Sequence, residues 1–379
     1  MPEPSPRAIA DEIAKTAALV TTFEPMARHT TFRIGGPADV FATVQTVEQL
    51  IHTINICREH QFPFFLLGAG SNILVSDRGI RGVVIRNKSA EFSLEEAASE
   101  WRLVRVDSGY PMPKFAVDMG KQGLGGCEFL QSIPGTMGGG VRQNVRFRNA
   151  GQFGRYDGLR ETGKTDCYLG ELVEDVEILT ERGERKTLAG SECGFTYTGF
   201  HASGFAPDPL SGPRAQPRKN HHAGEDTGGN PGEDPPPVIT RVRLKLQRDS
   251  VAAVKERLQQ YRAWRTHRTA IFSDQKIAQP EDVFTGVRAR QPGGATAGCV
   301  FFNVPNEHNH PTGRLIDLCG LKGHRIGRAE ISPFHANYIV NLGGARASDV
   351  HALMELAKET VFSRFGVTLV EEVERVGEW

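Results

Sequence analysis

The first quarter of the chain carries a helical hydrophobic pattern followed by short strand-like runs. Between residues 46 and 60 the apolar side chains recur at the spacing of one helical face, and Thr46 with Gln49 has the signature of an N-terminal capping box. Three apolar runs then predict buried strands: residues 62–67, 73–75 and 83–85. A turn is predicted at residues 76–79. The pattern predicts a small α/β unit.

Longer strands and two helices are predicted further along. Three apolar runs predict strands around a glycine-rich middle: residues 101–106, 172–179 and 238–246. Residues 251–268 predict a basic helix with Val254, Leu258 and Tyr261 facing inward. A last helix is expected to begin with Ser348 as its N-cap and to end at Gly366.

The segment from residue 200 to residue 237 has a different composition. It has almost no aliphatic residues and is dense in Pro, Gly, Asp and Asn, so we expect a flexible surface insertion. His221 and His222 lie inside it, and without further ligands a solvated pair is the simpler interpretation than a metal site. At 379 residues the chain exceeds one ordinary core, which predicts two or three domains.

Composition narrows the possible partners. Lys+Arg and Asp+Glu both number 45, and this zero net charge gives no reason to expect a nucleic-acid or anionic-membrane partner. No apolar run approaches the ~20 residues of a membrane span, and the first residues lack the apolar core of a secretion signal. Six cysteines are scattered without a CxxC pair, as expected for free thiols in a cytoplasmic protein.

Two glycine-rich segments carry the candidate chemistry. Residues 67–77 read LGAGSNILVSD, and residues 126–154 form a longer segment with almost no acid. Such backbones can turn N–H groups toward a phosphate or a ring edge, which favours a bound nucleotide cofactor. The first segment is not a dinucleotide fingerprint, because Ile73 replaces the third glycine and a strand follows. Taken alone, it is most simply a tight turn.

Further motifs place these loops in a family. In order along the chain they are HTTFRIGGPA (29–38), GAGSN (68–72), IPGTMGGG (133–140), NAGQFG (149–154), AGCVFFN (297–303), GRLIDLCGLKG (313–323), HANYIVN (335–341) and EEV (371–373). In this order and spacing the set resembles the UDP-N-acetylenolpyruvoylglucosamine reductase family, the MurB flavoenzymes of peptidoglycan synthesis. The resemblance covers roughly residues 23–199 and 238–377.

The resemblance implies a fold and an activity. The fold would be α+β, a two-subdomain FAD-binding fold of the vanillyl-alcohol-oxidase (PCMH) type plus a C-terminal α+β substrate domain. The implied divisions are residues 23–88, 89–249 and 250–379. FAD would take a hydride from NADPH and pass it to the enolpyruvyl group of a UDP-sugar, giving UDP-N-acetylmuramate for cell-wall biogenesis and cell division. We expect a cytoplasmic monomer with no nucleic-acid or membrane partner and no metal.

The resemblance also assigns cofactor-binding residues, most of them glycines and small polar residues of the two loops. They are Arg33, Gly68, Ala69, Gly70, Ser71, Asn72, Pro134, Gly135, Thr136, Gly138, Gly139, Asn149 and Ala150.

Two catalytic residues and three substrate-binding residues follow from the same resemblance. Cys299 stands where the family usually has a serine acid, and a thiol, with an ordinary pKa of about 8.5, is the better proton donor. Composition alone would favour a buried structural cysteine. Glu372 matches the family's catalytic glutamate, and Tyr197, Asn303 and Lys322 match substrate-binding residues. Without the motifs, Glu372 and Lys322 would be taken for solvated surface charges.

One departure from the family leaves alternatives open. The family arginine after Tyr197 is Thr198 here, and threonine supplies neither a charge nor a bidentate fork. Phe302 also stands where many relatives have lysine. We predict that an arginine from residues 142–148, or Arg155, compensates. The alternatives are a flavin-binding homologue that has lost catalysis, or an oxidoreductase of the same fold acting on another substrate.

Overall fold

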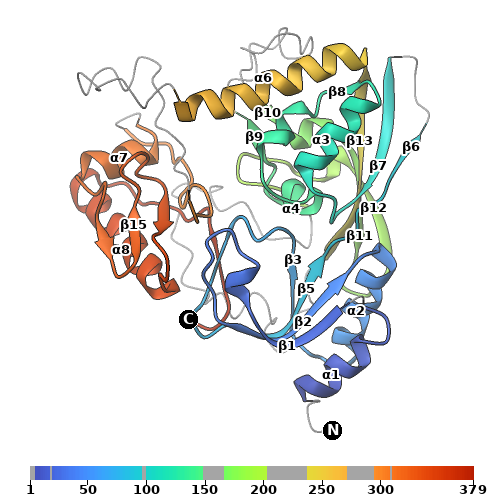
Figure 1. Cartoon of the computed structure of the whole chain (residues 1–379), viewed down its shortest axis with the longest axis horizontal. Coiled ribbons are helices and arrows are strands. Elements are labelled where there is room, and N and C mark those ends of the chain that lie inside the picture. The colour runs from blue at the N-terminus through green and yellow to red at the C-terminus, as the bar shows by residue number, and fades with distance from the viewer. Residues whose placement is uncertain are drawn as a thin grey trace.

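The computed structural model describes residues 5–17, 19–95, 100–147, 166–202, 237–270 (side chains to 262), 294–307 and 310–379. Figure 1 shows two units built on β-sheets and a third, C-terminal unit beside them.

The first unit is a four-stranded sheet with two helices packed on it. Its strand order is β1 (Leu19–Pro25), β2 (Pro37–Val44), β5 (Ile80–Asn87), β3 (Phe64–Leu67), with β2, β5 and β3 parallel. The helices are α1 (Pro6–Ile13) and α2 (Val47–Glu59). Helix α2 begins where predicted, because the Thr46 hydroxyl accepts the Gln49 N–H at 3.1 Å. Ile54 and Val83 lie in the core between helix and sheet.

The second unit is a larger antiparallel sheet. Its order is β12 (Arg185–Ala189), β11 (Val173–Leu179), β13 (Val238–Arg248), β7 (Trp101–Asp107), β6 (Phe92–Glu95), and β8 (Leu124–Gly125) pairs with the end of β13. The predicted strands β7, β11 and β13 are confirmed. Shorter elements around this sheet are α3 (Met112–Lys121), η2 (Glu128–Ser132), α4 (Met137–Arg142), β9 (Arg146–Phe147), β10 (Cys167–Tyr168), η4 (Leu169–Leu172) and η5 (Gly190–Glu192).

Helix α6 (Val251–Ala270) packs on the second unit (Figure 1). Val254, Leu258 and Tyr261 face inward as predicted, and they share one core with Phe115 of α3. The sequence predicts that residues from 250 onward belong to the C-terminal domain. Because α6 buries its apolar face against α3 and η2, we propose that the domain boundary falls after this helix.

The predicted insertion begins later than expected. Phe200 and Ala202 are only 3% and 4% exposed and lie in the core of the second unit, so these residues are not part of a surface segment. Residues 203–236, with His221 and His222, lie outside the described part of the chain.

The C-terminal unit combines a short antiparallel sheet with two helices. Its elements are α7 (Thr312–Leu318), β14 (Arg325–Ile326), β15 (Ala329–Ile331), β16 (Ile339–Asn341) and α8 (Ala347–Phe365). The chain then returns to the first unit (Figure 1), where β17 (Glu374–Val376) pairs in parallel with β4 (Ile73–Val75). Strand β4 was predicted as part of the first α/β unit. It pairs instead with the last strand of the chain.

The start of α8 also differs from the prediction. Ser348 is not the N-cap, because the helix begins at Ala347. The Asp77 carboxylate, 270 positions earlier, accepts the N–H of Ala347 at 2.7 Å and that of Ser348 at 3.0 Å. It thus supplies the acceptor that a local cap would provide. The predicted end is confirmed, since Gly366 has the left-handed conformation with φ 64°.

Candidate active site

The two glycine-rich loops of the sequence meet in space. A Cβ on Gly68 would lie 2.5 Å from Oγ1 of Thr136 in the second loop. The Ser71 hydroxyl donates a hydrogen bond of 3.2 Å to the carbonyl of Pro134. These contacts join segments more than sixty positions apart into one backbone surface.

The first loop requires glycine at its centre. Gly70 has φ +63°, and a Cβ there would lie 2.2 Å from the carbonyl oxygen of His29. Its own carbonyl accepts the Thr31 N–H at 2.9 Å, so the HTTFRIGG segment closes on this turn. Only glycine satisfies both the left-handed angle and the close approach.

The loops present free hydrogen-bond donors. Within the described part of the chain, the backbone N–H groups of residues 69–72, and those of Gly135 and Thr136, donate to no other residue. Six such donors on two touching loops suit an oxygen-rich anionic group such as a pyrophosphate. The donor set therefore fits FAD. Among the described residues no cluster of His, Cys, Asp and Glu could hold a metal ion.

The second loop is held by the strand end that precedes α3. Gly138 donates its N–H to the carbonyl of Ser108 at 2.7 Å, and Met137 donates to that of Tyr110 at 2.8 Å. The Ser108 hydroxyl accepts a bond of 2.9 Å from the Asn87 side chain, which comes from β5 of the first unit. The position of the loop thus depends on both units.

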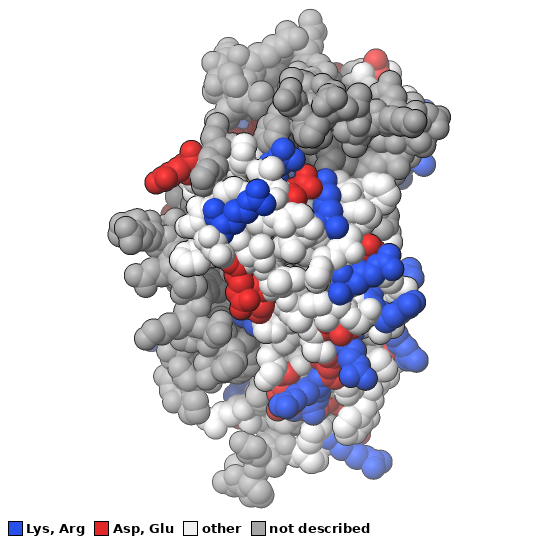
Figure 2. All heavy atoms as spheres, turned by 90° about the vertical axis from the view of Figure 1, so that its left-hand side faces the viewer, with Lys and Arg blue, Asp and Glu red and all other residues white. Residues whose placement is uncertain are grey.

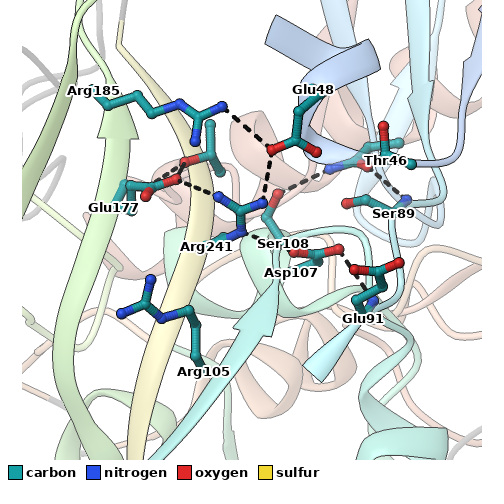
Figure 3. A network of polar contacts seen from close by, with 12 residues as sticks. Thr46, Glu48, Ser89, Glu91, Arg105, Asp107, Ser108, Glu177, Arg185 and Arg241 are labelled. Carbon is teal, nitrogen blue, oxygen red and sulfur yellow. Dashed lines mark hydrogen bonds and ion pairs between the residues drawn. The ribbon is translucent and has the colours of Figure 1, made fainter. Parts of the chain in front are cut away.

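A charged network next to Ser108 joins the same units (Figure 3). The Arg241 guanidinium contacts Glu48 of α2 at 3.0 Å, Asp107 of β7 at 3.2 Å and Glu177 of β11 at 3.3 Å. Burial raises the pKa of the Asp107 carboxyl, and the ion pair with Arg241 opposes this shift. Because Asp107 directly precedes Ser108, this network fixes the strand end on which Gly138 rests.

Arg33, a predicted cofactor residue, lies on an exposed turn near the first loop. Its φ is 54°, an uncommon value for a residue with a side chain. The Asn341 side chain donates to the carbonyl of Phe32 at 2.9 Å and to that of Arg33 at 3.3 Å. Asn341 of the C-terminal unit therefore supports this conformation.

Cys299 and Glu372 lie on neighbouring backbone segments. Cys299 forms a β-bridge with Tyr338, and the Glu372 N–H donates to the carbonyl of Val300 at 2.9 Å. Both side chains are partly exposed. Residues 299–302 thus run between two segments of the C-terminal unit, which places the backbones of the two predicted catalytic residues on adjacent segments.

Asn337 holds this arrangement and was not assigned a role from the sequence. Its side chain accepts the Phe301 N–H at 3.0 Å and donates to the Phe301 carbonyl at 2.8 Å, and it is only 2% exposed. The HANYIVN motif was a signal for it, but the motif alone does not show which backbone the amide reaches.

Two of the predicted substrate-binding residues, Tyr197 and Asn303, are hydrogen-bonded to each other. The Tyr197 hydroxyl accepts the Asn303 N–H at 3.0 Å, and Oδ1 of Asn303 accepts the Thr312 N–H at 3.0 Å at the start of α7. Lys322, just after α7, pairs with Asp317 at 3.1 Å. Asp317 also pairs with Arg314 at 3.1 Å, so two cations surround one carboxylate on α7.

Thr198 and Phe302, the two positions that differ from the family, are both buried and packed against neighbouring side chains. Thr198 is 7% exposed, and its hydroxyl lies 3.0 Å from Nε2 of His201 and 2.9 Å from Oγ1 of Thr196. Phe302 is 7% exposed and packs edge-on against Tyr197, with ring centroids 5.8 Å apart. Neither position offers a charge to a ligand.

Four of the predicted residues cannot be placed: Asn149, Ala150, Arg148 and Arg155 lie outside the described part of the chain.

On the face shown in Figure 2, Lys and Arg side chains are interspersed with Asp and Glu. In the described ranges no helix combines the length and apolar character that a membrane crossing needs.

Comparisons with known proteins agree with this geometry. Residues 38–157 match the family described as an FAD binding domain, and residues 290–376 match the C-terminal domain of UDP-N-acetylenolpyruvoylglucosamine reductase. The reductase of that name from Desulfosudis oleivorans is 35% identical over 94% of each chain. The one from Moorella thermoacetica is 33% identical over 95% of this chain and 94% of its own. The crystal structure of the Thermus caldophilus enzyme (MurB) covers 94% of this chain and 98% of its own, with 28% identity and a TM-score of 0.59.

The fold and the paired glycine loops define an FAD-dependent oxidoreductase, which confirms the predicted α+β FAD-binding fold. The match extends to the C-terminal unit that carries Cys299 and Glu372. The chain belongs to the UDP-N-acetylenolpyruvoylglucosamine reductase family.

Proposed function

We propose that this protein uses NADPH to reduce the enolpyruvyl group of UDP-N-acetylglucosamine enolpyruvate, forming UDP-N-acetylmuramate for peptidoglycan synthesis. The observation that carries the proposal is the link between cofactor loop and acid segment: Asn72 donates its side-chain N–H to the carbonyl of Glu372 at 2.9 Å. Bound FAD would supply the hydride transfer from NADPH to the methylene carbon of the substrate, which no side chain can perform.

The side chains supply the proton and the binding. Hydride addition to one carbon of the double bond requires a proton on the other, and Cys299 is the group assigned to give it. The neighbouring Glu372 supports the same step. Lys322 and Asn303 hold the substrate, whose carboxylate and diphosphate need cationic and hydrogen-bond donors.

A second candidate function is supported by Thr198 and Phe302. Because both positions lack the charge of the family residue, the protein could instead be a flavin-binding homologue that has lost catalysis. A cytoplasmic location and a monomeric state remain further predictions.

Half-reaction kinetics test the proposal. Stopped-flow flavin absorbance would follow reduction by NADPH, and then reoxidation by the enolpyruvyl substrate, in the wild type and in Cys299→Ser, Cys299→Ala and Glu372→Gln. We expect Cys299→Ser to keep substantial activity, and Cys299→Ala to slow reoxidation by about 10²–10⁴-fold with normal reduction. Glu372→Gln should likewise slow only reoxidation.

The matched control is Cys319→Ser, the other partly exposed cysteine, which should leave both half-reactions unchanged. If NADPH no longer reduces the flavin of Cys299→Ala, the acid assignment is wrong. If NADPH reduces the wild-type flavin but the enolpyruvyl substrate does not reoxidise it, the proposed reaction is wrong, and a homologue that has lost catalysis or that acts on another substrate takes its place.

A further inference from the structure

Arg146 is a half-buried cation that pairs with no carboxylate among the described residues. The centre of its guanidinium lies 3.8 Å from the centroid of the Tyr197 ring. Within the described ranges, this guanidinium makes no ion pair and no hydrogen bond. Arg142, four residues earlier, is exposed and pairs with Glu374 at 3.5 Å. The two arginines of one segment therefore have different surroundings.

Backbone contacts fix the place of Arg146. The Asn144 side chain donates to the carbonyl of Thr196 at 2.8 Å, and Phe200 donates its N–H to the carbonyl of Arg142 at 2.9 Å. Arg146 itself is in β9, paired with Tyr168 of β10. These two contacts, both at positions before Arg146, join the basic segment to the turn on either side of Tyr197.

This position lies within the candidate substrate site. The ring that Arg146 covers belongs to the residue whose hydroxyl accepts the Asn303 N–H at 3.0 Å. Stacking covers only the face of a guanidinium, and its N–H donors point outward in the plane. The donors of Arg146 therefore remain available for a ligand next to Tyr197 and Asn303.

We infer that Arg146 binds an anionic oxygen group of the sugar-nucleotide substrate and supplies the charge that Thr198 lacks. The inference rests on the proposed function. Arg146 is partly buried, and an anionic partner stabilises a partly buried cation, but the described residues provide no such partner. The planar fork of arginine matches both a carboxylate and a diphosphate. Both groups occur on the proposed substrate.

Calorimetric binding to the FAD-loaded protein tests this inference without turnover. The ligands would be the enolpyruvyl substrate, and UDP-N-acetylglucosamine, which has the diphosphate but no enolpyruvyl carboxylate. The variants would be Arg146→Ala and Arg146→Lys, with Arg142→Ala as the matched control. FAD content and the rate of flavin reduction by NADPH would be recorded for each.

We expect Arg146→Ala to weaken binding of the enolpyruvyl substrate by about 10–100-fold, as for a lost charge-assisted hydrogen bond, with unchanged FAD content and flavin reduction. Arg146→Lys should recover part of the loss because it keeps the charge, and Arg142→Ala should bind nearly as the wild type. An equal loss for UDP-N-acetylglucosamine assigns the contact to the diphosphate. A loss confined to the enolpyruvyl ligand assigns it to the carboxylate.

Unchanged binding in Arg146→Ala would overturn the inference, and so would a wild type that binds neither ligand. A wild type that binds the substrate without turning it over contradicts only the proposed function. A binding loss in Arg146→Ala would then still support the role of Arg146.

Discussion

The side-chain amide of Asn72 donates a 2.9 Å hydrogen bond to the carbonyl oxygen of Glu372, although 300 positions separate the two residues. The Asn72 carbonyl in turn accepts the N–H of Glu374 at 2.9 Å. One residue of the first glycine loop thus holds the segment that carries a predicted catalytic residue. The first glycine loop and the segment that carries Glu372 are thus joined by both the side chain and the backbone of Asn72.

Replacing Asn72 by alanine should therefore affect turnover more than cofactor binding. The variant loses the bond to Glu372 but keeps its backbone N–H for the cofactor, so we expect turnover to fall about 2–10-fold with the flavin still bound. Ser71→Ala is the contrasting variant, because it removes the bond between the two loops. It should weaken FAD affinity and leave the turnover of the loaded enzyme near normal. Equal effects of both variants on FAD affinity would contradict the separate role of Asn72.

The wild-type protein should purify yellow, with one noncovalently held FAD, and Gly70→Ala should be colourless. The added methyl would lie 2.2 Å from the His29 carbonyl, and the φ of +63° is unfavourable for alanine. Gly366→Ala is the matched control, since its φ of +64° is similar and no atom lies within 4 Å of the added Cβ. It should keep the flavin and lose only about 1 kcal/mol of stability. Normal flavin absorbance in Gly70→Ala would show that the loop tolerates a side chain.

The six cysteines should differ sharply in reactivity. Burial raises the pKa of the Cys57, Cys167 and Cys193 thiols to about 12, and that of the fully buried Cys127 also lies well above its usual value. Cys299 and Cys319 are partly exposed. At about pH 8 a disulfide reagent should modify these two first, because the thiolate is the reacting form and access limits the others. Peptide mass spectrometry identifies the sites, and fast labelling of any buried cysteine would contradict the packing around it.

His351 should make the protein less stable in mild acid. Burial and the charge of Arg375 lower the pKa of His351 below its usual 6.5, and the Arg375 guanidinium contacts Nε2 at 3.0 Å. Glu355, 3.4 Å away, and Glu371 oppose the shift, while Lys358 adds to it. The Trp379 ring packs edge-on against the imidazole of His351, with the ring centroids 5.3 Å apart.

The sign follows from proton binding. With a lowered folded pKa, the unfolded chain binds a proton more readily, so the stability that His351 contributes is present above pH 6.5 and is lost as the pH falls through the folded pKa. His351→Gln should therefore show a smaller drop in melting temperature than the wild type between about pH 7.5 and 5.5. Parallel curves for the two proteins would mean that His351 does not titrate differently on folding.

The sequence alone determined the elements that depend on near neighbours. Helix α2 is encoded by the spacing of its apolar residues and by the hydrogen bond between Thr46 and Gln49, three residues apart. No distant contact is needed to predict it. Gly366 likewise ends α8 through its own backbone freedom. The ordered motifs identified the family, because they record residue types at fixed spacings rather than contacts.

Only the tertiary structure decided which distant segments meet. Asp77 replaces Ser348 as the partner of the first N–H groups of α8, and β4 pairs with β17 rather than with its neighbours in sequence. Arg146 was one of several candidate arginines, and its stacking on Tyr197 separates it from the paired Arg142. A carboxylate, a strand edge and a guanidinium can each interact with many different groups. Which group each one meets depends on how the chain folds. Local sequence patterns encode backbone angles and the spacing of apolar residues. These long-range pairings depend instead on the fold of the whole chain.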